Sequence, residues 1–142
     1  MLAARTSALR TARRTLSPLA VSASPRLFSS SALTAKHLLN ATPADFQELA
    51  VKGSRPAIVD FYADWCGPCR VLGPVLEKVV TDESGADLLK IDTEEHGELA
   101  AKYKITALPT VIAFKNGEIV AKMVGAAGEP GVRAFLEKAT SA

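Results

Sequence analysis

The sequence predicts an α/β domain whose central mixed sheet has five strands and is flanked by four helices. Two patterns lead to this fold class. Short apolar segments alternate with amphipathic helical segments through most of the domain, which is typical of parallel strands joined by helices. Near the end, two strand-like segments flank Asn116-Gly117, a strong hairpin signal and therefore a sign of an antiparallel pair. Together these patterns predict a mixed sheet with helices on both faces.

The first elements follow in order from residue 36. We expect residues 36–39 to supply a first edge strand. Residues 42–45, Thr-Pro-Ala-Asp, predict a helix start, because Thr can cap, Pro suits the first helical position, and the acid can bond back to the cap. Residues 57–63 are almost continuously apolar, which predicts a central strand buried on both faces.

The middle of the chain continues the alternation. A helix beginning near Cys66 carries apolar residues at helical spacing through Val80, and Pro74 inside it predicts a kink. Residues 88–92 predict the next strand. Residues 94–103 predict a short helix with acids in its first turn, where negative charge is favourable.

The last third of the domain predicts the hairpin and a closing helix. Residues 110–114 are rich in β-branched side chains and predict a strand. The turn at residues 115–118 leads into a return strand at residues 119–124, and residues 130–140 predict the final helix.

Residues 1–35 differ in composition from the rest of the chain. They hold five arginines and no acid, and they are rich in Ser, Thr and Ala. This composition predicts a mitochondrial transit peptide that is cleaved to leave a domain at residues 36–142, with the mitochondrial matrix as the destination. Cleavage just after Arg26 and cleavage before Lys36 both stay open, as do a plastid destination and an unprocessed tail.

Removing that segment changes the charge of the protein. The whole chain has a net charge of +2, but residues 36–142 hold 12 basic and 15 acidic side chains. The basic character therefore belongs to the targeting segment, and we expect no nucleic-acid partner. The chain contains no run of 18 or more apolar residues, so we expect no membrane span.

The two cysteines of the chain lie in one motif, Trp65-Cys66-Gly67-Pro68-Cys69-Arg70. Two thiols three residues apart can form and open a disulfide, and the free N–H groups of a helix N-terminus stabilise a thiolate. The motif is therefore typical of a redox dithiol. Residues 59–69, Val-Asp-Phe-Tyr-Ala-Asp-Trp-Cys-Gly-Pro-Cys, resemble the signature of the thioredoxin family. The resemblance extends over residues 36–142 and implies the thioredoxin fold.

The dithiol has two different expected roles. Cys66, at the helix N-terminus, is the expected nucleophile that attacks a substrate disulfide. Cys69, one turn later and expected to be more buried, is the resolving thiol. Gly67 and Pro68 allow the tight entry turn and modulate the geometry between the two cysteines.

Asp60 interrupts an apolar strand, where burial should raise the pKa of its carboxyl. The resemblance implies that Asp60 accepts a proton below Cys69 and returns it. An acid at the strand end that merely reaches solvent is the alternative. Lys90 matches the family's partner lysine and would modulate Asp60, although a surface lysine with a partly buried stem is nearly as good an interpretation.

Pro109 precedes a strand, which by itself is an ordinary place for proline. The resemblance implies that this proline is cis, faces the dithiol and leaves the backbone of Leu108 free to pair with an extended substrate segment. An uncharged substrate-binding rim around Cys66 is then expected, formed by Trp65, Leu108, Pro109, Gly125 and Ala126 together with Gly67 and Pro68.

The resemblance implies a protein-disulfide reductase that is itself reduced by an NADPH-dependent thioredoxin reductase. Peroxiredoxins are expected among its substrates, and we expect a monomer with no bound cofactor, because NADPH and flavin belong to the reductase. An oxidase or isomerase of the same fold, a glutaredoxin and a non-catalytic binding module are alternatives. A zinc site or metal carrier is a further one, but His37 and His96 are isolated and a tetrahedral site needs two more ligands.

Overall fold

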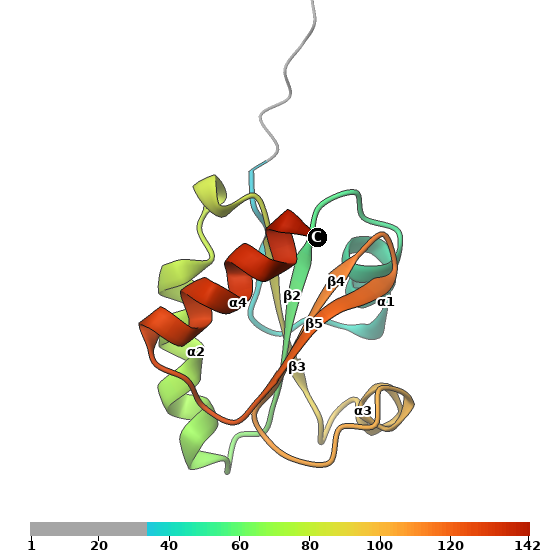
Figure 1. Cartoon of the computed structure of the whole chain (residues 1–142). Coiled ribbons are helices and arrows are strands. Elements are labelled where there is room, and N and C mark those ends of the chain that lie inside the picture. Colours follow the sequence, from blue (N-terminus) through green and yellow to red (C-terminus); the bar gives the residue numbers. More distant parts are fainter. Residues whose placement is uncertain (1–33) are drawn as a thin grey trace, which may run out of the picture. The chain divides into compact units, whose positions relative to one another are not determined.

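The computed structural model describes residues 34–142, and the predicted transit peptide falls almost entirely on residues outside this range. The described part is a five-stranded sheet flanked by helices (Figure 1). The strands are β1 (His37–Leu38), β2 (Ala57–Tyr62), β3 (Asp87–Asp92), β4 (Thr110–Lys115) and β5 (Glu118–Val124). The helices are α1 (Pro43–Phe46), α2 (Gly67–Val79), α3 (Gly97–Lys102) and α4 (Glu129–Ser141).

The sheet is mixed, as the sequence predicts. Its strand order is β1-β3-β2-β4-β5, so β2 lies in the centre with β3 on one side and β4 on the other. The pairs β1–β3 and β2–β3 are parallel, whereas β2–β4 and β4–β5 are antiparallel. The β4–β5 turn contains Asn116 and Gly117, both with positive φ, which suits a tight hairpin.

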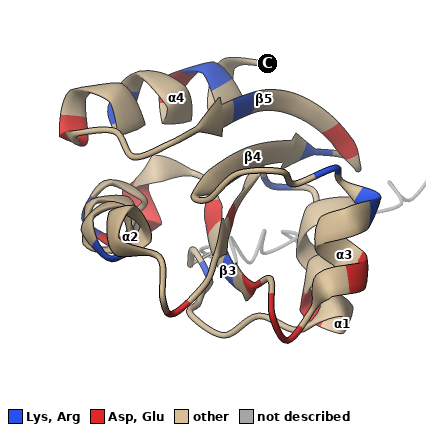
Figure 2. Ribbon diagram, turned by 90° about the horizontal axis from the view of Figure 1, so that it is seen from below, with Lys and Arg blue, Asp and Glu red and all other residues tan. Residues whose placement is uncertain are grey.

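Helices cover both faces of the sheet (Figure 2). Side chains of α2 and α4 share one apolar core with Ile58, Leu88 and Val111, while α1 and α3 share a second core with Val59 and Leu89. Neighbouring positions along a strand thus face different cores, because side chains alternate across a sheet. This alternation decides which face carries the polar residues of the central strands.

The helix boundaries differ from the predictions in two places. Residues 42–45 form the expected capping box, in which Asp45 N–H donates to Thr42 Oγ1 and Thr42 N–H donates to Asp45 Oδ2, but α1 passes into a π-helical turn at Gln47–Val51. The prediction that this helix, α3, starts at residue 94 was wrong. Helix α3 begins at Gly97, because Asp92 Oδ1 accepts the Glu94 N–H at 2.8 Å and holds the preceding residues in a turn. Helix α2 runs through Pro74, and the kink there stays a prediction.

Candidate active site

The dithiol lies where the central strand β2 passes into α2. Cys66 is the N-cap residue of α2, and Cys69 lies in its first turn. The two form a disulfide with an S–S distance of 2.06 Å. The Cys69 backbone N–H donates to Cys66 Sγ at 3.2 Å, so one of the free donors of the helix N-terminus already points at this sulfur. The same donor would stabilise a Cys66 thiolate.

Both cysteines are buried in this disulfide-bonded state. Cys66 is 3% exposed and Cys69 is 5% exposed, so the expectation that Cys69 is the more buried of the two was wrong. The reason is that the disulfide draws both residues into one small cluster, where they pack with Ala63 and against Leu108.

Asp60 lies on the face of the sheet that α2 covers. Its neighbours on β2, Val59 and Phe61, face the opposite core. Its register partner on β4 is the buried Val111. Asp60 is fully buried, and neither of its carboxyl oxygens has a hydrogen-bond partner among the described residues. An acid that reaches solvent, the alternative interpretation, therefore does not apply.

This environment changes the proton affinity of Asp60. Loss of hydration on burial raises the pKa of the carboxyl to about 7, the positive charge of Lys90 opposes the rise, and the negative charge of Glu77 adds to it. A carboxyl with this pKa can both take and return a proton near neutral pH.

Lys90 sits beside Asp60 in the sheet. The two residues are register partners across β2 and β3, and both face α2. The Lys90 ammonium lies 3.2 Å from Glu77 Oε1 and 5.4 Å from the centre of the Tyr62 ring. Its side chain is only 18% exposed, which separates it from an ordinary surface lysine. Sequence reasoning missed Glu77, because it contacts Lys90 only after α2 has folded over the sheet.

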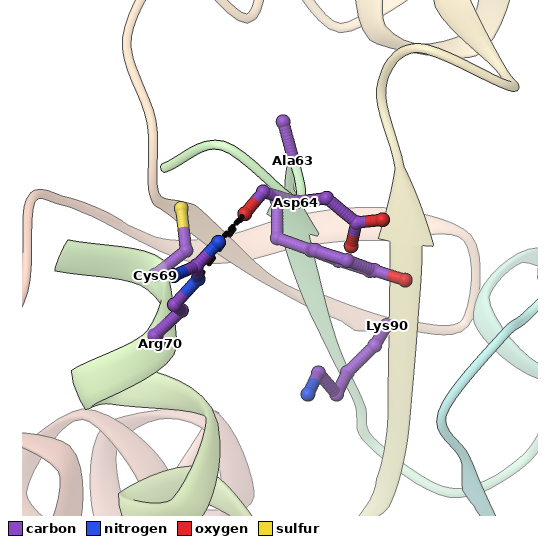
Figure 3. Close-up of a pocket in the computed structure, with 6 residues that line it drawn as sticks. Ala63, Asp64, Cys69, Arg70 and Lys90 are labelled. Carbon is purple, nitrogen blue, oxygen red and sulfur yellow. Dashed lines mark hydrogen bonds between the residues drawn. The ribbon is translucent and has the colours of Figure 1, made fainter. Parts of the chain in front are cut away.

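A pocket of about 180 Å³ opens beside Cys69 (Figure 3). Arg70 closes part of its wall by donating two hydrogen bonds to the Asp64 backbone carbonyl, the shorter at 2.7 Å. Asp64 and Arg70 are exposed, as expected, but this link between loop and helix was not predicted. Lys90 lines the same pocket, so the pocket gives access to both Cys69 and the lysine next to Asp60.

Five of the expected rim residues lie on three loops at this end of the sheet: Trp65, Leu108, Pro109, Gly125 and Ala126. Trp65 is 68% exposed, and its indole N–H donates to Glu94 Oε1 at 3.0 Å, a partner that sequence reasoning missed. The Leu108–Pro109 peptide is cis, as the resemblance implies. Pro109 in turn accepts a hydrogen bond from the Gly125 N–H at 2.8 Å, which ties the loop after β5 to the loop before β4.

The remaining rim residues are exposed, whereas Pro109 is buried, and contact of the rim with a substrate stays a prediction. Gly67 and Pro68 lie at the surface in the first turn of α2. Ala126 follows Gly125 and is also exposed. The neighbouring groove between Trp65 and Leu108 has a volume of about 250 Å³ and is lined mainly by small and apolar side chains of the α3–β4 connection.

No metal-binding arrangement accompanies the dithiol in residues 34–142, where no three His, Cys, Asp or Glu side chains are grouped to hold an ion. Among the helices of the same range, none is long and apolar enough to cross a membrane.

Comparison with known proteins decides the family. The family model described as Thioredoxin matches residues 37–138, which include the dithiol, Asp60 and the cis proline. The chain belongs to the thioredoxin family. Two solved structures share the fold. A thioredoxin from Malassezia sympodialis has a TM-score of 0.65 and 29% identity, and the match covers 77% of this chain and 92% of that one. A mutant thioredoxin from Halobacterium salinarum has a TM-score of 0.66 and 32% identity, and the match covers 74% of this chain and 91% of that one.

Curated thioredoxins are similar in sequence as well. A mitochondrial thioredoxin from Bos taurus is 48% identical over 95 residues, which are 66% of this chain and 57% of the bovine protein. The chain thus spans somewhat more than half the length of that relative. A probable thioredoxin-2 from Caenorhabditis elegans is 40% identical over 131 residues, covering 87% of this chain and 90% of that protein.

Proposed function

We propose that this thioredoxin is a thiol-disulfide oxidoreductase that reduces protein disulfides through Cys66 and Cys69. The observation that supports this most strongly is the pairing of a disulfide-forming dithiol at a helix N-terminus with a buried, unpartnered Asp60 on the sheet face below that helix. A binding module that used only the exposed rim would need neither feature.

The reaction has two exchange steps. The Cys66 thiolate attacks one sulfur of a substrate disulfide, forms a mixed disulfide and releases the other sulfur as a thiolate that takes a proton. The Cys69 thiol then gives its proton to Asp60, and its sulfur attacks Cys66 Sγ. This step closes the Cys66–Cys69 disulfide and releases the second substrate thiol, so two electrons have passed to the substrate.

The other groups of the site orient the substrate. An extended segment of the substrate pairs with the backbone at Leu108, and the uncharged rim of Trp65, Pro109, Gly125 and Ala126 receives the side chains that flank its cysteine. Gly67 and Pro68 hold the spacing of the two cysteines, and Lys90 modulates Asp60. The redox-active disulfide is the electron carrier, without a bound cofactor.

The family supports the proposed partners, and the composition of residues 1–35 supports the proposed location. A thioredoxin reductase that uses NADPH and flavin returns two electrons to the disulfide, and disulfide-bonded proteins such as peroxiredoxins consume them. The protein acts as a monomer in the mitochondrial matrix, to which residues 1–35 direct it. The mitochondrial names of the mammalian relatives support this location.

The first experiment measures the redox potential of the full chain together with NADPH-dependent reduction of insulin by a thioredoxin reductase. We expect a potential more reducing than the glutathione pool and turnover that Cys69→Ser abolishes while the protein stays folded. A potential above the glutathione poise would contradict the reductase assignment and favour an oxidase or isomerase. Turnover that survives in Cys69→Ser would contradict the resolving role of that residue.

Location has a separate test. Residues 1–35 fused to a fluorescent protein should carry it into mitochondria, and replacing the five arginines by glutamine should leave it outside. Delivery to plastids, or no import, would contradict the targeting proposal without affecting the redox proposal.

A further inference from the structure

Two residues of helix α2 determine the position of the Lys90 ammonium. Glu77 and Gly73 are four residues apart on this helix and therefore lie on one face of it. Glu77 Oε1 accepts a hydrogen bond from Lys90 Nζ at 3.2 Å. At Gly73, an added Cβ would come within 3.0 Å of the same nitrogen, so a side chain there would have to displace the ammonium. The gap at Gly73 and the carboxylate of Glu77 together fix where the lysine head group lies.

The position of the Lys90 ammonium affects the electric field at the Asp60 carboxyl. Asp60 is fully buried, and without a hydrogen bond to hold either protonation state its charge is controlled by the field around it. On the same strand as Asp60, Tyr62 is neutral at neutral pH. On β4, the register partner of Asp60 is the apolar Val111. From β3 it faces Lys90, and the carboxylate of Glu77 on α2 also acts on it by its charge.

We propose that Glu77 is a positioning residue that, with the gap at Gly73, draws the Lys90 ammonium onto α2 and thereby sets how readily Asp60 exchanges a proton with Cys69. The inference rests on the proposed function, because it names a residue that tunes the resolving step of that reaction. Glu77 touches neither the substrate nor the reacting sulfurs. It acts through Lys90, whose ammonium is held to α2 and is less available to stabilise an ionised Asp60.

The variant Glu77→Gln tests this inference with little risk to folding, because Glu77 is 37% exposed. The side chain keeps its shape but loses its charge, so Lys90 is released and its field acts on Asp60 without compensation. In the oxidised full chain, the ¹³C chemical shift of the Asp60 carboxyl should then titrate at lower pH than in the wild type, by roughly half a pH unit or more. Glu137→Gln, which removes an exposed carboxylate of α4, is the matched control and should leave the midpoint in place.

A double-mutant cycle separates positioning from a direct charge effect. Lys90→Met should raise the Asp60 midpoint, and in that background Glu77→Gln should lower it by clearly less than it does when Lys90 is present. An equal shift in both backgrounds would mean that Glu77 acts only by its own field, and would overturn the positioning role. No shift in Glu77→Gln alone, or an upward one, would overturn the inference altogether.

The activity readout keeps this inference distinct from the proposed function. If the wild type reduces insulin, the acid limb of its pH–rate profile should move to lower pH in Glu77→Gln and stay unchanged in Glu137→Gln. If the wild type does not reduce insulin, the proposed function fails, whereas the carboxyl titration still decides whether Glu77 and Lys90 control Asp60.

Discussion

At the scale of single residues, Asp60 links the chemistry of the site to the stability of the protein. Its pKa is raised from 3.8 to about 7 on folding. Between these two values the folded protein keeps a proton that the unfolded chain releases, so the free energy of unfolding falls as pH rises through this window. Above pH 7 the folded state carries a buried carboxylate, and the accumulated loss is on the order of 4 kcal/mol.

Asp60→Asn should remove this pH-dependent loss. The amide is close in shape to the protonated acid but cannot ionise, so the variant should match the wild type near pH 4 and exceed its stability at pH 8.5 by up to about 4 kcal/mol. Urea denaturation at a series of pH values measures the difference. Two stability curves that run parallel across this range would show that Asp60 titrates normally. The gain in stability should come with slower disulfide reduction, since the variant lacks the proposed proton acceptor.

Some residue-level features could be predicted from the sequence and others could not. Asp60 was identifiable because a carboxylate inside an apolar strand is unusual. Glu77 and Glu94 were not, because their partners Lys90 and Trp65 lie 13 and 29 residues away in the sequence. Nothing in the local pattern distinguishes these two glutamates from acids that face only solvent, so their roles appear only once the chain has folded.

At the scale of elements, the β4–β5 hairpin is the feature that local sequence specifies most tightly. Gly117 has φ +82°, and an added Cβ would lie 3.0 Å from the Val51 carbonyl oxygen. Both the left-handed backbone and this backbone contact favour glycine at the position.

Gly117→Ala should therefore lower the free energy of unfolding by about 1–2 kcal/mol. Gly97→Ala is the matched control, because Gly97 lies in the first turn of α3 with open space around its Cα and no positive φ. It should be neutral or slightly stabilising, since alanine restricts the unfolded chain more than glycine does. Thermal unfolding of the two variants side by side measures the contrast. Equal losses would mean that neither the backbone conformation nor the contact with Val51 matters at residue 117.

Element boundaries were harder to predict than element types. All five strands and four helices were expected from apolar periodicity and turn residues, and each is present. The error at the start of α3 arose because Glu94 and Glu95 suit a first helical turn, yet the Asp92 side chain binds the Glu94 N–H and delays the helix. A single side-chain hydrogen bond thus outweighed helix propensity over three residues.

At the scale of the whole domain, one sheet serves two cores. Strand β2 sends Ile58 to the core under α2 and α4, and Val59 to the core under α1 and α3. Since the same strands carry both cores, neither face can lose its packing without disturbing the backbone that supports the other. The shared sheet also explains why Asp60 and Lys90 stay in register beneath α2. The next residue on each strand, Phe61 and Ile91, packs into the core on the opposite face and holds the two strands in place.

Ile58→Val and Ile91→Val test whether the two faces unfold as one cooperative unit, because each removes one buried methylene from a different core. Each substitution should cost about 0.5–1.5 kcal/mol. The costs should add to within about 0.5 kcal/mol in the double variant, since the two side chains share no core cluster. Unfolding should nevertheless remain a single transition when followed by both Trp65 fluorescence and far-UV circular dichroism. Two separated transitions would mean that the faces unfold independently, and the sheet would then not hold the site and the far core as one cooperative unit.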